Sequence, residues 1–188
     1  MPNMHKVFTY SRSSANDEGQ NEIVPLDIAR SLDAILVLGG GAPSSISSPP
    51  EYVKCRCEAA AKIVLTVMES ASDQDHTNDL LSSTLQPAIL CLSAGTAHLP
   101  QLLSKDGLPI WESTASASYI LQNYPAITPS RVFAETTSYD TISNAFFART
   151  SFTDIVGWKR LLIVTNEVSN MEFCLDALSS MQAYFICV

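Results

Sequence analysis

Positive charge is scarce in this chain. Its 188 residues include 11 lysines and arginines against 19 aspartates and glutamates, which gives a formal net charge of −8. No stretch combines basic residues with interleaved aromatic residues. A surface of this sign repels a phosphate backbone, so we expect no nucleic acid among the partners. The expected partner is a small-molecule ligand.

Long apolar runs are also missing. No run of apolar residues reaches the roughly 18 that a membrane-spanning helix needs. The first thirty residues have no apolar signal-peptide core, and Asp17, Glu18 and Glu22 are atypical of a transit peptide. We therefore expect no membrane anchor, a cytoplasmic location and a polar, poorly ordered leader over residues 1–30.

Paired cysteines are absent as well. The five cysteines form no C-x-x-C pair and have no histidine at zinc-finger spacing. Two of them, Cys55 and Cys57, lie two residues apart on a predicted helix and therefore point to different faces. The interpretation is reduced, buried thiols in a cytosolic protein, with no metal site and no disulfide framework.

Apolar strands and amphipathic helices alternate along the remainder, residues 31–188, which is long enough for one domain with one substantial core. Predicted strands cover residues 34–38, 88–95, 131–135 and 160–167, and predicted helices begin at Glu51, Glu112 and Asp140. This order indicates βαβ units, hence an α/β fold with a mostly parallel sheet covered by helices on both faces. A further short strand is expected near the C-terminus.

Polar residues follow each predicted strand. The exits are Gly39–Gly41, Ser93–Thr96, Glu135–Ser138 and residues 165–167. Parallel sheets bind ligands beyond the carboxyl ends of their strands, so these exits predict one polar pocket. Glycines there either bring backbone amides close to an anionic ligand or simply allow a turn with positive φ.

The familiar nucleotide and hydrolase motifs fail at this pocket. A dinucleotide fingerprint requires a glycine turn that opens directly into a helix, but Gly39–Gly41 are followed by Pro43. A P-loop is also excluded, because no Lys-Ser or Lys-Thr follows the glycines. Cys91 stands where a nucleophile elbow needs glycine, so Ser93 is read mainly as a ligand-binding or turn-capping hydroxyl.

Each of the other candidate site residues has a structural interpretation as well as a functional one. Ser138 or Asp140 could cap the helix that contains Thr141 and Asn144, and Glu112 could favour a helix dipole. Alternatively, Glu112 and Glu135 could act as acid and base or share a divalent ion across the rim. Arg56 could hold an anionic ligand, or lie solvated on its helix.

Taken together, the motifs resemble the YdcF-like family, a domain of unknown function. The resemblance covers residues 33–167 and is carried by motifs in the family's order: DAILVLGGG, Arg56, ILCLSAGTAH, KDGLPIWESTASASYIL, VFAETTSYDTISNA and LLIVTNE. It implies a three-layer α/β/α Rossmann-like sandwich. It also implies a pocket formed by Gly40, Gly41, Arg56, Ser93, Gly95, Glu112, Glu135, Ser138, Thr141 and Asn144, with S-adenosylmethionine as the cofactor proposed within the family.

The resemblance stops at the C-terminal tail, residues 168–188. The family has a histidine and an arginine there, where this chain has Ser169 and Glu172. We expect either a truncated product or a divergent member; an incomplete sheet would leave an edge open to self-association.

Three functions follow from these observations. The first is binding of a nucleotide-like or anionic small molecule, with enzymatic activity left open. The second is a hydrolase or transferase for a phosphate-bearing or lipid-linked substrate. The third is an inactive isoform that serves only in interactions.

Overall fold

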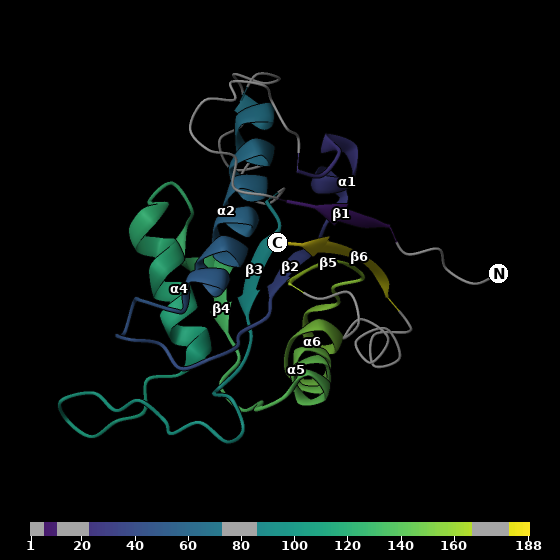
Figure 1. Ribbon diagram of the computed structural model, residues 1–188. Coiled ribbons are helices and arrows are strands. Elements are labelled where there is room, and N and C mark those ends of the chain that lie inside the picture. The colour runs from purple at the N-terminus through teal and green to yellow at the C-terminus, as the bar shows by residue number, and fades with distance from the viewer. Residues whose placement is uncertain (1–5, 11–22, 73–85, 167–180) are drawn as a thin grey trace.

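Six parallel strands form the centre of the protein, here described from a computed structural model for residues 6–10, 23–72, 86–166 and 181–188. The strand order is β1-β6-β5-β2-β3-β4 (Figure 1). The strands are β1 (Val7–Thr9), β2 (Ala34–Val37), β3 (Ala88–Cys91), β4 (Val132–Ala134), β5 (Arg160–Thr165) and β6 (Gln182–Cys187). The predicted α/β class with a parallel sheet is confirmed.

Helices cover both faces of this sheet. One face packs against α1 (Leu26–Ser31), α2 (Glu51–Ser72) and α4 (Glu112–Asn123). The other face packs against α5 (Thr141–Ala148), near which lie η2 (Arg149–Thr153) and α6 (Asp154–Val156). A short 3-10 turn, η1 (Pro129–Arg131), leads into β4.

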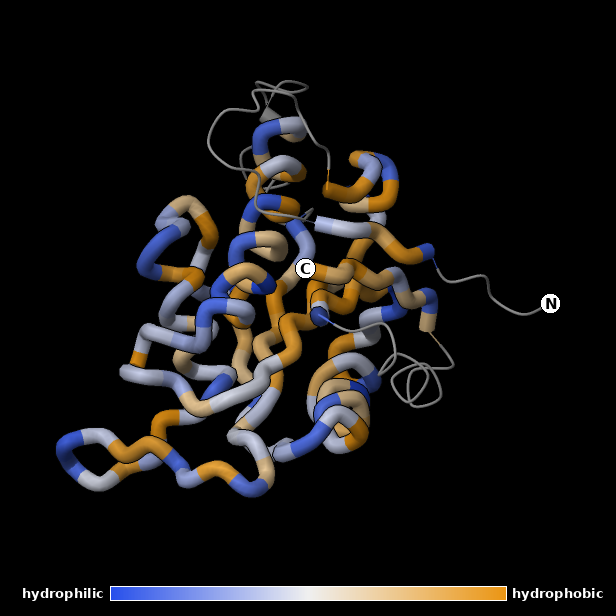
Figure 2. Tube along the Cα trace, viewed as in Figure 1, coloured by the Kyte–Doolittle hydropathy of each residue, from blue (hydrophilic) through white to orange (hydrophobic). Residues whose placement is uncertain are grey.

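The sheet has an apolar cluster of buried side chains on each face, which explains why the central strands are hydrophobic throughout. Successive side chains of a strand point to opposite faces, so Ile35 and Val37 join one cluster whereas Ala34 and Leu36 join the other. All four residues of β2 are buried, as expected for a strand with helices on both sides. Figure 2 shows the hydrophobic colour concentrated on these central strands.

The expectation of a poorly ordered leader over residues 1–30 is wrong for two segments. Val7–Thr9 form β1, which pairs in parallel with β6, and Leu26–Ser31 form α1, whose Ile28 and Ala29 are buried. Both segments are short and have polar neighbours, so they contain too few apolar residues to show the periodicity of a helix or a strand. They gain their structure by packing on β6 and α2.

Asp33 joins the beginnings of two neighbouring strands. Its Oδ2 accepts the backbone amides of Lys159 at 2.7 Å and Arg160 at 2.8 Å. Although partial burial by itself would raise the pKa of Asp33, these hydrogen bonds and the charge of Arg160 outweigh burial and lower it. The carboxylate thereby fixes β2 against β5 at the edge opposite the predicted pocket.

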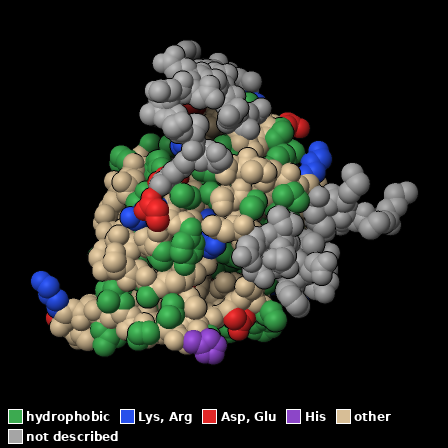
Figure 3. Space-filling view, viewed as in Figure 1, with side chains coloured by type: hydrophobic (Ala, Val, Ile, Leu, Met, Phe, Trp, Pro, Cys, Tyr) green, Lys and Arg blue, Asp and Glu red, His purple; other side chains and the backbone are tan. Residues whose placement is uncertain are grey.

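No helix within the described residues is long and apolar enough to cross a membrane. On the face seen in Figure 3, Lys and Arg side chains are few and scattered.

Candidate functional site

Four strand ends meet at one edge of the sheet. Because β5, β2, β3 and β4 are adjacent and parallel, the loops that leave them lie side by side. Hydrogen bonds join these loops: the Gly41 amide donates to Thr96 Oγ1 at 2.8 Å, and the Ala94 amide donates to the Ser138 carbonyl at 2.8 Å. The fold therefore brings the predicted glycines, Ser93 and Glu135 to a common rim.

The turn after β2 needs glycine because it lies in close contact with the loop that leaves β3. A Cβ on Gly39 would lie 2.5 Å from the Leu92 carbonyl oxygen and 2.6 Å from Ser93 Cβ. Gly40 and Gly41 have φ of 153° and 79°, which favour glycine. The Tyr52 hydroxyl also donates to the Gly40 carbonyl at 2.7 Å. Two glycines thus permit the conformation and the third permits contact with the β3 exit.

Arg56 is buried beneath this turn, which excludes the solvated interpretation. Its Nη1 donates to the Leu38 and Gly39 carbonyls at 2.7 and 2.8 Å, and its Nε donates to Asn166 Oδ1 at 2.6 Å. Burial lowers the pKa of the guanidinium, although Tyr52, Cys57 and Glu112 oppose the shift. The third nitrogen, Nη2, donates to none of the described residues.

Ser93 occupies the turn after β3 with φ of 94°, a conformation that non-glycine residues rarely adopt. Its hydroxyl donates to the Gly95 carbonyl at 3.0 Å. His98 is exposed and forms none of the hydrogen bonds described around Ser93. The arrangement supports a turn-capping hydroxyl rather than an activated nucleophile.

The Glu135 carboxylate organises its own loop. Oε1 accepts the amides of Thr137 and Ser138, and Oε2 accepts the Ser138 hydroxyl, which also contacts Asn144 Oδ1. Glu135, Ser138 and Asn144 are all buried. Both carboxylate oxygens are therefore occupied by structural hydrogen bonds.

Asp140, and not Ser138, caps α5. Its Oδ1 accepts the Ser143 amide at 2.7 Å, and the Ser143 hydroxyl accepts the Asp140 amide in return. The hydrogen bond from the Ser143 backbone lowers the pKa of Asp140. Thr141 begins α5 and takes part in none of the hydrogen bonds around Glu135 described above.

Glu112, the first residue of α4, differs from Glu135. The residue is 3% exposed; Oε1 accepts the Thr96 hydroxyl at 2.7 Å, whereas Oε2 has no partner among the described residues. No hydrogen bond in the described part of the chain links it to Glu135. Within residues 6–10, 23–72, 86–166 and 181–188, no group of three or more His, Cys, Asp or Glu is placed to hold a metal ion.

Three further residues support the site. Tyr52 donates to the Gly40 carbonyl, Thr96 donates to Glu112, and Asn166 accepts a hydrogen bond from Arg56. Thr96 and Asn166 belong to the predicted strand exits, although no individual role was predicted for them, whereas a lone tyrosine early in a helix carried no signal and Tyr52 was missed. Ser169 and Glu172 lie outside the described residues.

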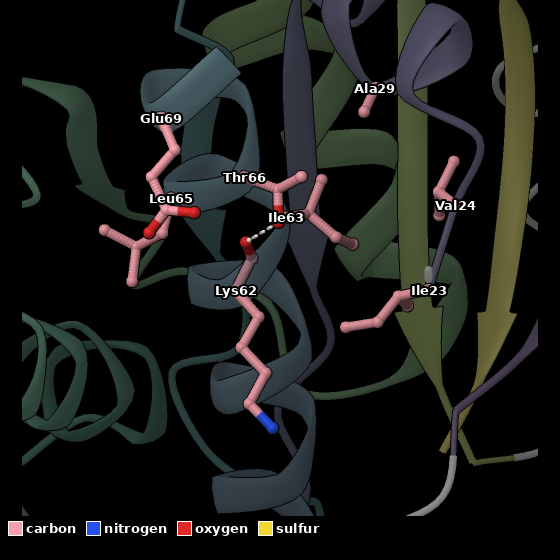
Figure 4. A pocket seen from close by; sticks show the side chains of 8 residues that line it. All are labelled: Ile23, Val24, Ala29, Lys62, Ile63, Leu65, Thr66 and Glu69. Carbon is pink, nitrogen blue, oxygen red and sulfur yellow. Dashed lines mark hydrogen bonds between the residues drawn. The ribbon is translucent and has the colours of Figure 1, made fainter. Parts of the chain in front are cut away.

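A cavity of about 260 Å³ lies outside the candidate site, between α1 and α2, toward the edge of the sheet where the strands begin (Figure 4). Its lining is Ile23, Val24, Ala29, Lys62, Ile63, Leu65, Thr66 and Glu69. Lys62 donates to the Tyr10 hydroxyl at 2.9 Å, and Glu69 also has an interaction partner. Its charged groups are thus engaged, unlike Glu112 Oε2 at the strand ends.

No family model, curated protein or solved structure matches this chain.

Proposed function

We propose that this chain binds a small anionic or nucleotide-like molecule, with S-adenosylmethionine as the first ligand to test, at the carboxyl ends of β2, β3, β4 and β5. The observation that carries the proposal is the pair of buried ionic groups with an unused atom. Arg56 retains Nη2 and Glu112 retains Oε2, and both border the glycine turn. Most other polar groups of the rim are engaged in hydrogen bonds of the fold.

The position of Arg56 supports an anionic ligand group. Its Nε and Nη1 are held by Asn166 and two carbonyls, so the guanidinium is oriented before any ligand arrives. Burial strengthens a charge-assisted hydrogen bond from Nη2 because solvent screening is reduced. Preorganisation of this kind lowers the entropic cost of binding.

Thermal unfolding with S-adenosylmethionine, ATP, AMP and inorganic phosphate tests the proposal. We expect at least one of them to raise the melting temperature saturably. Arg56→Lys keeps the charge but loses the planar fork, and should weaken binding about tenfold or more. Arg30→Lys, on α1 at the opposite edge, is the matched control and should bind as the wild type does. No saturable response to any ligand would refute the proposal and favour a role in interactions alone.

A second function, hydrolysis or transfer of a phosphate-bearing group, is favoured by Glu112. A general acid or base needs an oxygen that the fold does not already use, and of the two rim carboxylates Glu112 keeps one without a partner among the described residues, whereas both oxygens of Glu135 are occupied. We therefore reassign the acid/base role from the pair to Glu112. Phosphate release that is lost in Glu112→Gln and kept in a folded Glu135→Gln would support this activity; the reverse pattern would exclude it.

A further inference from the structure

Both exposed tyrosines of this protein lie at the edge of the sheet where the strands end. Of the six tyrosines, only Tyr52 and Tyr139 are exposed, at 42% and 45%. Tyr52, the second residue of α2, lies against the glycine turn after β2, and Tyr139 lies against Gly95 in the loop after β3. An aromatic ring left open at the border of a polar pocket offers a ligand a large apolar contact.

The Tyr52 ring is fixed although it is exposed. Its hydroxyl donates to the Gly40 carbonyl at 2.7 Å, and the Arg56 guanidinium lies over the ring, with Cζ 5.4 Å from the ring centroid. A cation over an aromatic face is attracted to it, and the hydrogen bond holds the far end of the side chain. The ring therefore loses little freedom when a ligand packs on it, which lowers the entropic cost of binding.

This fixed ring adjoins the unused donor of Arg56. Nη2 is bonded to the same Cζ that lies over the ring, so an anionic group held by Nη2 lies beside Tyr52. The guanidinium occupies one face of the ring, and the exposed part of Tyr52 remains for the rest of the ligand. A flat ligand group gains the most contact there, because aromatic rings stack face to face with an offset. Nucleobases stack on protein aromatic side chains in this way.

We infer that Tyr52 is the stacking surface for a planar ring of the ligand, so that the site prefers a nucleotide-like molecule to an anion without such a ring. The inference rests on the proposed function, since Tyr52 and Nη2 of Arg56 contact the same ligand. It narrows the ligand class from small anions in general to those that carry a nucleobase or a similar ring.

Ligand pairs with and without an adenine ring test the inference. Isothermal titration calorimetry of the wild-type protein compares AMP with ribose 5-phosphate, ATP with tripolyphosphate, and S-adenosylmethionine with methionine. In a pair that binds, we expect the adenine-bearing member to bind about tenfold more tightly or better, as one stacked base provides. Equal affinity within every binding pair would overturn the inference and leave the proposed function standing. If no ligand binds, both are refuted.

Two variants of Tyr52 separate stacking from support of the glycine turn. Tyr52→Phe keeps the ring and loses the hydrogen bond to Gly40, so the preference for adenine should remain. Tyr52→Leu removes the ring and should weaken the adenine-bearing ligand about tenfold, while its counterpart changes less than about twofold. Equal weakening of both ligands by Tyr52→Leu would show support of the turn alone and overturn the inference. Phe146→Leu removes an exposed ring from α5 and, as the matched control, should keep the wild-type preference.

Discussion

Replacement of Gly39 by alanine should separate the exits of β2 and β3. The added methyl would lie 2.5 Å from the Leu92 carbonyl oxygen, 2.6 Å from Ser93 Cβ and 3.0 Å from Glu112 Oε2. Normal carbon contacts are about 3.5–4.0 Å, so two contacts overlap by roughly 1 Å. The nearest atom belongs to the backbone, so no flexible side chain can swing away.

The size of the effect follows from this geometry. Overpacking in a close-packed region costs about 1–3 kcal/mol and occasionally more. With backbone in the overlap we expect about 3 kcal/mol, which is a fall of about 6–12 °C in melting temperature for a chain of this size. Urea unfolding monitored by circular dichroism measures the free energy directly.

Gly107→Ala is the matched control. Gly107 has φ of 79° but no atom within 4 Å of its Cβ position, so alanine there adds backbone strain of about 1–2 kcal/mol and no overlap. A Gly39→Ala protein no less stable than Gly107→Ala would refute the close approach of the two loops.

Two further predictions concern titratable groups. Because the folded-state pKa of Asp33 is lowered, its contribution to stability is complete above the unfolded value of about 3.9 and disappears as pH falls through the folded value. Asp33→Asn should therefore destabilise the protein at pH 7 and lose that deficit as pH falls through the folded-state pKa, as measured by urea unfolding at neutral and at acidic pH; a deficit independent of pH would contradict the assignment. Burial raises the pKa of the Cys57 thiol to about 12 and raises the pKa of Cys91 well above its usual value, so iodoacetamide at pH 8 should modify the partly exposed Cys55 before Cys57 and Cys91, as read by peptide mass spectrometry. Equal modification of Cys55, Cys57 and Cys91 in the folded protein would show that the described core is not closed.

Much of the architecture could be predicted because it depends on local patterns. The short apolar segments at β2, β3 and β5 and the stripe on α2 mark elements that are buried whatever their neighbours are. β1 and α1 could not be predicted in this way. Each has few residues and is stabilised by a partner far away in the sequence, as Val7 is by Phe185.

The gathering of the predicted polar residues at one edge of the sheet followed from the sequence, but the hydrogen-bond role of each residue did not. Glu112 and Glu135 are acidic residues that each follow a strand in the sequence. Yet the oxygens of Glu135 accept hydrogen bonds from its own loop, whereas Glu112 Oε2 accepts none from the described residues. That difference depends on which amides and hydroxyls reach each carboxylate. Likewise, burial of Arg56 depends on the carbonyls of a turn 17 and 18 residues away.

The sequence by itself determined the layered α/β class and the edge where polar loops collect, because strand burial and parallel connections follow from hydrophobic periodicity and chain direction alone. Only the tertiary structure decided which side chains at that edge have all their polar atoms engaged in the fold and which keep an atom without a partner among the described residues. Hydrogen-bond saturation is a property of three-dimensional neighbours, and those neighbours come from loops that are far apart along the chain.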